Sequence, residues 1–140
     1  MRAQSILTLL IAILCLAGVV VSALALAEHY NTKPSPCSIN DRWDCGIVNH
    51  SPYAMVHQIP VALIGIVGYA LLGMIAGRLP LLTALTALAA LCFTLRLTWI
   101  EWKILGVWCI YCVSSQILIA IVFLLSLVAG LGSGHRRRSL

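Results

Sequence analysis

Residues 107–132 read VWCIYCVSSQILIAIVFLLSLVAGLG, an apolar stretch without a charged residue that opens close to a Cys-x-x-Cys motif. About 20 apolar residues in a helix are enough to cross a bilayer's hydrocarbon core, so this stretch predicts a transmembrane helix. The whole chain has the same character, because 61% of its 140 residues are hydrophobic and only 9% are charged. A single soluble core cannot bury so much apolar surface in so short a chain, which indicates a small integral membrane protein.

Three further apolar stretches are predicted to cross the membrane. They cover residues 5–27, 59–77 and 79–100, and the last is interrupted only by Arg96. Each is expected to be helical, because backbone groups left unpaired in lipid are too costly. The predicted fold class is therefore an all-α membrane protein. It is a four-transmembrane-helix bundle, a single domain over residues 1–140, with a long extracytoplasmic loop between the first two helices.

The first stretch also has features of a secretory signal. Met1-Arg2 precedes it, and Ala25-Leu26-Ala27 ends it with small residues, as at a cleavage site. Its apolar run is longer than the roughly 7–15 residues of a signal's hydrophobic region. This difference favours an uncleaved membrane anchor.

The basic residues predict the orientation of the helices. Four crossings place both termini on the side that carries Arg2, Arg78 and the arginines of residues 136–138, with no acidic residue. Loops rich in Lys and Arg face the cytoplasm, so both termini are expected there. Residues 28–58 and 96–108 are then expected on the opposite side.

The net charge of +5 does not indicate a nucleic-acid partner. Three of the nine basic residues lie in the C-terminal cluster, and no basic stripe alternates with aromatic residues. A nucleic-acid interface would need such a stripe.

The six cysteines divide into two kinds by position. Cys15 and Cys92 lie within predicted helices among Leu and Ala, where a cysteine acts as a small apolar residue, so both are expected to pack. The other four are expected on the extracytoplasmic side, where an oxidising environment allows disulfides to persist. They are Cys37 and Cys45, here called the loop pair, and Cys109 and Cys112, here called the helix pair.

The helix pair opens the last predicted helix with both sulfurs on one face. The partial positive charge of a helix N-terminus lowers the pKa of a thiol and favours the reactive thiolate. Half of a zinc site has the same spacing, and His29, His50 and His57 could supply further ligands. The position at a membrane helix and the presence of a second pair favour redox chemistry over metal binding.

The loop pair lies in a polar segment introduced by Pro34 and Pro36. A disulfide between its cysteines would close a short loop, either as a structural staple or as a redox shuttle whose thiol reaches Cys109. Two dithiol pairs on one membrane face can pass electrons by thiol–disulfide exchange to a membrane-soluble acceptor. The spacing favours this relay.

Four sequence elements follow one another in a definite order. They are Cys37 with Cys45, Ser51, Gly65-x-x-x-Tyr69, and Cys109-x-x-Cys112 at the start of the last of four helices. Over residues 5–131 this order resembles the vitamin K epoxide reductase family. Another four-helix, quinone-linked family carries its Cys-x-x-Cys in the first outer loop, so the chain is not similar to that one.

The resemblance implies an oxidoreductase of a bacterial inner membrane that passes electrons to a quinone, either ubiquinone or menaquinone. Cys109 and Cys112 would form the active-site disulfide, and Cys112 would react with the quinone. Cys45 would attack Cys109, and Cys37 would exchange with an external partner. That partner would be a separate periplasmic thioredoxin-fold dithiol protein of the DsbA-like kind, supporting disulfide bond formation.

The resemblance also implies the residues that contact the quinone, which are Ser51, Gly65, Tyr69 and Gln116. Gln116 stands where vertebrate relatives have a tyrosine, and its amide can donate a hydrogen bond to a quinone carbonyl. Val61 stands where they have an asparagine and cannot donate one. Ser51 fits a helix cap equally well.

Two other functions stay open at this point. One is a vitamin K quinone or epoxide reductase, which uses the same residues to produce the hydroquinone. The other is a non-catalytic membrane protein whose outer cysteines form structural disulfides or bind zinc or copper. The relay without a bound metal is the interpretation that the sequence favours.

Overall fold

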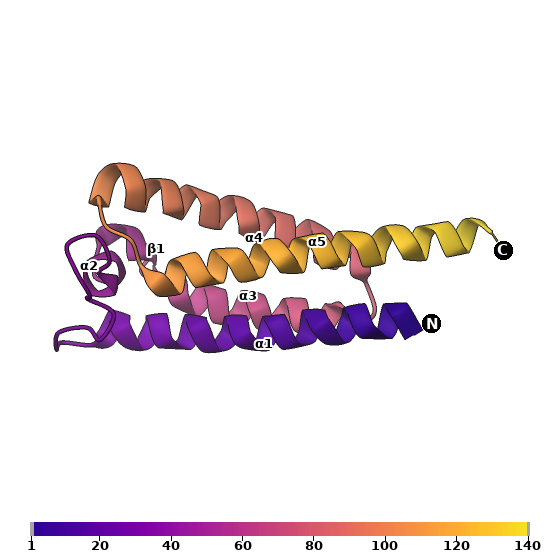
Figure 1. Ribbon diagram of the computed structural model, residues 1–140, viewed down its shortest axis with the longest axis horizontal. Helices are drawn as coiled ribbons and strands as arrows, with labels where there is room; N and C mark the ends of the chain where they lie inside the picture. Colours follow the sequence, from indigo (N-terminus) through magenta and orange to yellow (C-terminus); the bar gives the residue numbers. More distant parts are fainter. Residues whose placement is uncertain (1, 140) are drawn as a thin grey trace.

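The structure is a computed structural model that describes residues 2–139. Residues 1 and 140, the ends of the predicted domain, lie outside the described residues. Its long helices are α1 (Arg2–Tyr30), α3 (Val61–Ile75), α4 (Pro80–Ile100) and α5 (Ile110–Arg138). They lie alongside one another, and both ends of the chain are at the same end of the molecule (Figure 1). The chain is therefore mostly helical, as the sequence predicts.

Three of these helices are long and apolar enough to cross a membrane. They are α1, α5, and α4 together with the π-helical segment η2 (Glu101–Leu105) that continues it. The fourth, α3, has 15 residues and is a shorter apolar helix. Leucines on the outer faces of α1, α4 and α5, such as Leu16, Leu85 and Leu124, are exposed by more than half. Apolar surface of this extent, on helices of this length, is what a membrane protein presents to lipid.

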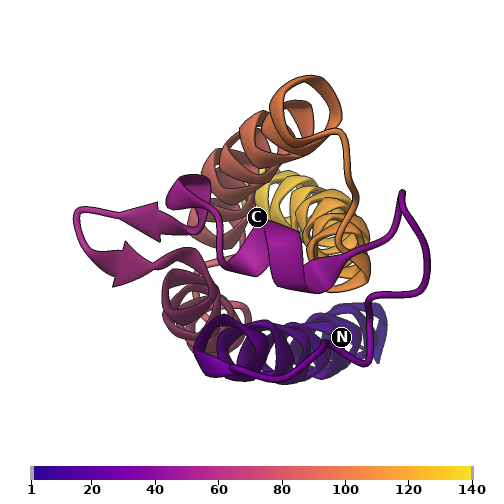
Figure 2. The ribbon, with the colours of Figure 1, turned by 90° about the vertical axis from the view of Figure 1, so that its left-hand side faces the viewer.

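Short elements connect α1 to α3 at the end of the molecule opposite the termini. They are α2 (Cys45–Asn49), the 3₁₀ turn η1 (Pro52–Ala54), and the strands β1 (Met55–Val56) and β2 (Ile59–Pro60). Figure 2 shows this segment lying across the ends of the long helices. The long predicted loop therefore contains local structure of its own.

The predicted helices are all present, but their bounds differ from those of the structure: α1 extends beyond residues 5–27, α5 continues six residues beyond 132, and two helices start later than predicted. The helix predicted at 59–77 begins at Val61, because β2 pairs antiparallel with β1. The helix predicted at 107–132 begins at Ile110, because the backbone of Trp108 hydrogen-bonds to the loop instead. In both places, backbone pairing with a neighbouring segment replaces the first helical turn.

Small residues bring α1 and α3 close together. A Cβ atom at Gly18 would overlap the ring of Tyr69, and one at Gly65 would lie 2.7 Å from the Ser22 hydroxyl. Cys15 is buried in the core between these helices, as expected. Cys92 is exposed on the outside of α4, so the prediction that it packs was wrong. A small apolar side chain facing outward is compatible with lipid and needs no packing partner.

Candidate active site

The loop pair forms a disulfide that closes the segment before α2. The Cα atoms of Cys37 and Cys45 are 5.4 Å apart, and both side chains are buried. Asp44 caps α2, because its carboxylate accepts hydrogen bonds from the Ile47 N–H at 3.1 Å and from the Ser38 hydroxyl at 2.7 Å. The Ser38 hydroxyl, with backbone N–H groups of α2, lowers the pKa of Asp44 below its ordinary value. The cap therefore fixes the direction of the helix that begins at Cys45.

Backbone pairing docks this loop beside the helix pair. The Asp44 N–H donates to the Trp108 carbonyl at 3.0 Å, and the Trp108 N–H donates to the Arg42 carbonyl at 2.6 Å. The rings of Trp43 and Trp108 are 6.4 Å apart between centroids. Cys45 follows one side of this bridge and Cys109 follows the other, so the bridge brings the two cysteines together.

Cys45 and Cys109 are both fully buried in one cluster with Cys37, Val48 and Val107. Asn49, at the end of α2, connects them. Its side-chain amide donates to the Cys45 carbonyl at 2.9 Å and to the Cys109 sulfur at 3.5 Å.

The helix pair is not disulfide-bonded in this structure. Cys109 is the N-cap residue directly before α5, and Cys112 lies in the first turn of that helix. A hydrogen bond from the Cys112 side chain lowers the pKa of Cys109 below its ordinary value. The backbone N–H groups of Tyr111 and Cys112 act in the same direction, while burial opposes them. Cys109 is thus the cysteine of the pair that more readily forms a thiolate.

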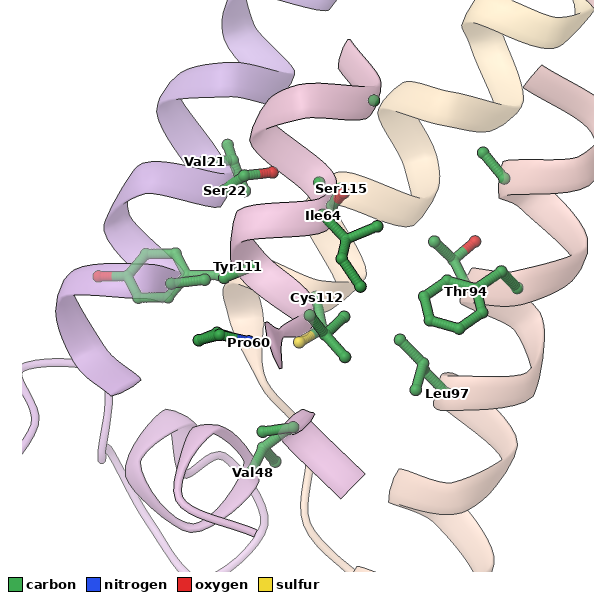
Figure 3. A pocket seen from close by; sticks show the side chains of 18 of the residues that line it. Val21, Ser22, Val48, Pro60, Ile64, Thr94, Leu97, Tyr111, Cys112 and Ser115 are labelled. Carbon is green, nitrogen blue, oxygen red and sulfur yellow. The ribbon is translucent and has the colours of Figure 1, made fainter. Parts of the chain in front are cut away.

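A cavity of about 390 Å³ lies next to the helix pair. Cys112 lies on its wall amid Val48, Pro60 and Ile64, with Leu97 of α4 across the space (Figure 3). Its lining is largely apolar, with a few polar side chains. Such a cavity suits a mostly apolar ligand held within reach of a sulfur atom.

Three of the four residues predicted to contact a quinone line this cavity: Ser51, Gly65 and Tyr69. Gln116 is not among the lining residues, and its amide oxygen instead accepts a hydrogen bond from the Thr98 hydroxyl. Val61, the position where vertebrate relatives have an asparagine, does line it.

The hydroxyls of Ser51 and Tyr69 have partners within the protein. Ser51 is the N-cap residue of η1, but its hydroxyl donates back to the Val48 carbonyl at 2.7 Å. The Tyr69 hydroxyl donates to the Ser115 carbonyl at 2.7 Å. Both side chains therefore form part of the cavity wall, and their hydroxyl protons are already used in hydrogen bonds to backbone carbonyls.

The histidines do not gather around the cysteines. His29 and His50 bond to backbone carbonyls of Asn49 and Gly46, and His57 lies in the β1–β2 turn. Within residues 2–139, no group of three His, Cys, Asp or Glu side chains could hold a metal ion.

Two further residues at this site were missed in the sequence. Asn49 touches both pairs, and Glu101 is 2% exposed, with its carboxylate accepting the Cys109 N–H at 3.2 Å. Of the two, only Glu101 could have been suspected from the sequence, because an acidic residue at the edge of an apolar span is unusual.

Comparison with known proteins assigns the chain to one family. A profile of the vitamin K epoxide reductase family matches residues 9–127, which is most of the chain and includes all four cysteines of the site. No curated protein matches the chain at a significant level. On the match over residues 9–127, the chain belongs to the vitamin K epoxide reductase family.

Proposed function

We propose that this membrane oxidoreductase carries electrons from a periplasmic thioredoxin-fold dithiol protein, through the loop pair and then the helix pair, to a quinone. Membership of the family implies thiol–disulfide and quinone redox chemistry in general. The observation that carries the specific route is the shared burial of Cys45 and Cys109 in one cluster, bridged by Asn49. Cys112 continues the route, since it lies on the cavity wall.

The route balances as a series of thiol–disulfide exchanges. The dithiol of the partner reduces the loop disulfide through Cys37, and the partner is left oxidised. The Cys45 thiolate then attacks Cys109 of an oxidised helix pair, and Cys112 leaves as a thiolate. Attack of Cys37 on Cys45 re-forms the loop disulfide and frees Cys109, so two electrons have moved to the helix pair.

Re-oxidation of the reduced helix pair to a disulfide needs an acceptor of two electrons and two protons, and a quinone supplies this chemistry. The cavity fits a quinone ring, because its wall is largely apolar and includes Cys112. Ubiquinone and menaquinone both meet these requirements. Apolar side chains of the cavity wall would pack against the ring beside the sulfur of Cys112.

The proposed topology has four crossings, with α3 as the fourth. Its 15 residues extend about 22 Å, less than the roughly 30 Å of a hydrocarbon core. The helix is flanked by the β1–β2 hairpin at one end and the Arg78 turn at the other, and a span shorter than the hydrocarbon core is accommodated by local thinning of the bilayer. Arginines at the end that holds both termini favour the cytoplasm for that end and the periplasm for the cysteines.

Thiol trapping in membranes tests the route. In Cys109→Ala and Cys112→Ala variants the loop pair is expected to change from oxidised to reduced, whereas in the parent chain added quinone keeps it oxidised. In Cys112→Ala the lone Cys109 thiolate is also expected to attack Cys45 of loop disulfides that are still oxidised, with Cys37 leaving as a thiolate, and the resulting Cys45–Cys109 disulfide is detectable by mass spectrometry. The control is Cys92→Ala, which removes an exposed cysteine of α4 far from the cluster. A loop pair that stays oxidised in every variant would show a structural staple and reject the proposal.

A further inference from the structure

Glu101 carries a carboxyl group in a buried and largely apolar environment. It is 2% exposed, lines the cavity beside Cys112, and belongs to the apolar span Pro80–Leu105. Among the described residues, no Lys, Arg or Asp lines this cavity. A carboxylate buried without a cation is costly and in membrane proteins marks functional sites.

The backbone around Glu101 directs it inward. It begins the π-helical segment η2, which ends at Gly106 in the left-handed conformation, with φ of 70°. The Gly106 N–H donates to the Glu101 carbonyl at 2.8 Å, which closes the wide turn. The next residues, Trp102 and Lys103, face outward, with the ammonium group 4.0 Å from the centre of the indole ring. Single π turns of this kind occur frequently at functional sites.

Both cysteines of the helix pair contact this carboxylate. One oxygen accepts the Cys109 N–H at 3.2 Å, and the Cys112 thiol lies within hydrogen-bonding reach of the same carboxylate, which competes with the Cys109 sulfur for the single thiol proton. The other titratable groups that line the cavity are His29, Tyr53, Tyr69 and Tyr111. Of these, Tyr69 donates its hydroxyl proton to Ser115, and His29 is bonded to the Asn49 carbonyl. Glu101 is thus the carboxyl group in contact with the reacting thiol.

We propose that Glu101 is a catalytic acid–base residue that takes the proton of the Cys112 thiol and passes it to a quinone oxygen. This inference rests on the proposed function. When the helix pair is oxidised, its two sulfurs lose two electrons and two protons and form one S–S bond. The quinone gains both electrons and both protons. Glu101 transfers one proton and returns to the carboxylate, while the proton from Cys109 exchanges through water.

A purely structural role would be to cap α5 through the Cys109 N–H. Glu101→Gln separates the two roles, because the glutamine amide keeps an oxygen that accepts this N–H but cannot take up a proton. Glu101→Asp keeps the carboxyl group and withdraws it by one methylene. Glu28→Gln is the matched control, since Glu28 is also a buried glutamate, 5% exposed, but is not among the residues that line the cavity.

The first measurement is the single-turnover oxidation of the reduced helix pair by a short-chain ubiquinone in detergent. General acid–base catalysis contributes roughly 100- to 10,000-fold, so Glu101→Gln is expected to slow this step at least about 100-fold. Glu101→Asp is expected to fall between Glu101→Gln and the parent, and Glu28→Gln to keep the parent's rate. A Glu101→Gln variant as fast as the parent would overturn the inference.

The second measurement needs no quinone. The rate of Cys112 alkylation by a neutral reagent is followed against pH in a Cys109→Ala background, so that no second thiol titrates beside Cys112. With Glu101 present the rate is expected to show two steps, because two interacting groups titrate together. Glu101→Gln is expected to show one step and Glu28→Gln two. An unchanged profile in Glu101→Gln would contradict the contact between the two groups.

The outcomes separate this inference from the proposed function. A parent chain that cannot pass electrons to quinone refutes the proposed function itself. If the parent passes electrons to quinone and Glu101→Gln does so at the same rate, only the proposed role of Glu101 is refuted. If Glu101→Gln does not fold, Glu101→Asp decides, because an oxidation rate equal to the parent's would show that the position of the carboxyl group does not matter.

Discussion

The side-chain amide of Asn49 donates a hydrogen bond to the sulfur of Cys109 across 3.5 Å, although 60 positions separate the two residues. The same nitrogen donates to the Cys45 carbonyl at 2.9 Å. Because Cys45 begins α2 and Asn49 ends it, this five-residue helix spans the gap between the two cysteine pairs. The two pairs are therefore connected by side-chain chemistry as well as by burial.

Replacement of Asn49 by alanine is expected to raise the pKa of Cys109. A hydrogen bond to a charged group stabilises the charged form, so loss of this donor to the sulfur is expected to raise the pKa of Cys109. The pH dependence of Cys109 alkylation measures it. Asn40→Ala is the control, because Asn40 bonds only to loop backbone N–H groups. Equal profiles in both variants would show that the amide does not act on the sulfur.

Replacements of Cys112 are expected to change the pKa of Cys109. The change depends on whether the new side chain can still donate a hydrogen bond to the Cys109 sulfur. The main cause of the low Cys109 pKa is the hydrogen bond from Cys112. Cys112→Ser keeps a hydroxyl donor, so Cys109 is expected to react with alkylating reagents at lower pH than in Cys112→Ala. Rates of iodoacetamide labelling across a pH series measure the difference. Identical rates would mean that the backbone N–H groups alone stabilise the thiolate.

Loss of the Asp44 cap is expected to open α2. Asp44→Ala removes the acceptor for the Ile47 N–H, and loss of an N-cap costs about 1 kcal/mol. Hydrogen exchange at Ile47 measures the opening. The folded protein lowers the pKa of Asp44, so the stabilisation is present at neutral pH and is lost as the pH falls below the ordinary carboxyl value and through the lowered one. Asp44→Asn is expected to show no such acid dependence.

Two glycines of α3 are expected to respond differently to an added methyl group. Both Gly65 and Gly68 line the cavity, but a Cβ at Gly65 would lie 2.7 Å from the Ser22 hydroxyl, whereas one at Gly68 meets no atom within 4 Å. Overpacking costs about 1–3 kcal/mol, so Gly65→Ala is expected to lower thermal stability in detergent. Gly68→Ala is expected to leave it unchanged. Equal melting temperatures would show that α1 and α3 can move apart freely.

The sequence alone determined the features that depend on local composition. Apolar runs separated by charged turns predicted the long helices, because each helix in lipid must satisfy its own backbone hydrogen bonds. The cysteine spacing and its order along the chain predicted the four cysteines of the site and the family, and the match over residues 9–127 confirms the family. These features need no knowledge of which helix lies beside which.

Only the tertiary structure decided which side chains meet. The pairing of Trp43 with Trp108, which docks the loop, joins segments 65 positions apart, and no local pattern specifies such a partner. In the sequence, Asn49 is an ordinary loop residue and Glu101 is a charged residue at the edge of a membrane span. In the folded protein, both side chains contact the cysteines. The late start of α5 has the same origin. Contacts distant in sequence depend on the packing of the whole bundle, whereas helix formation depends mainly on each segment's own residues.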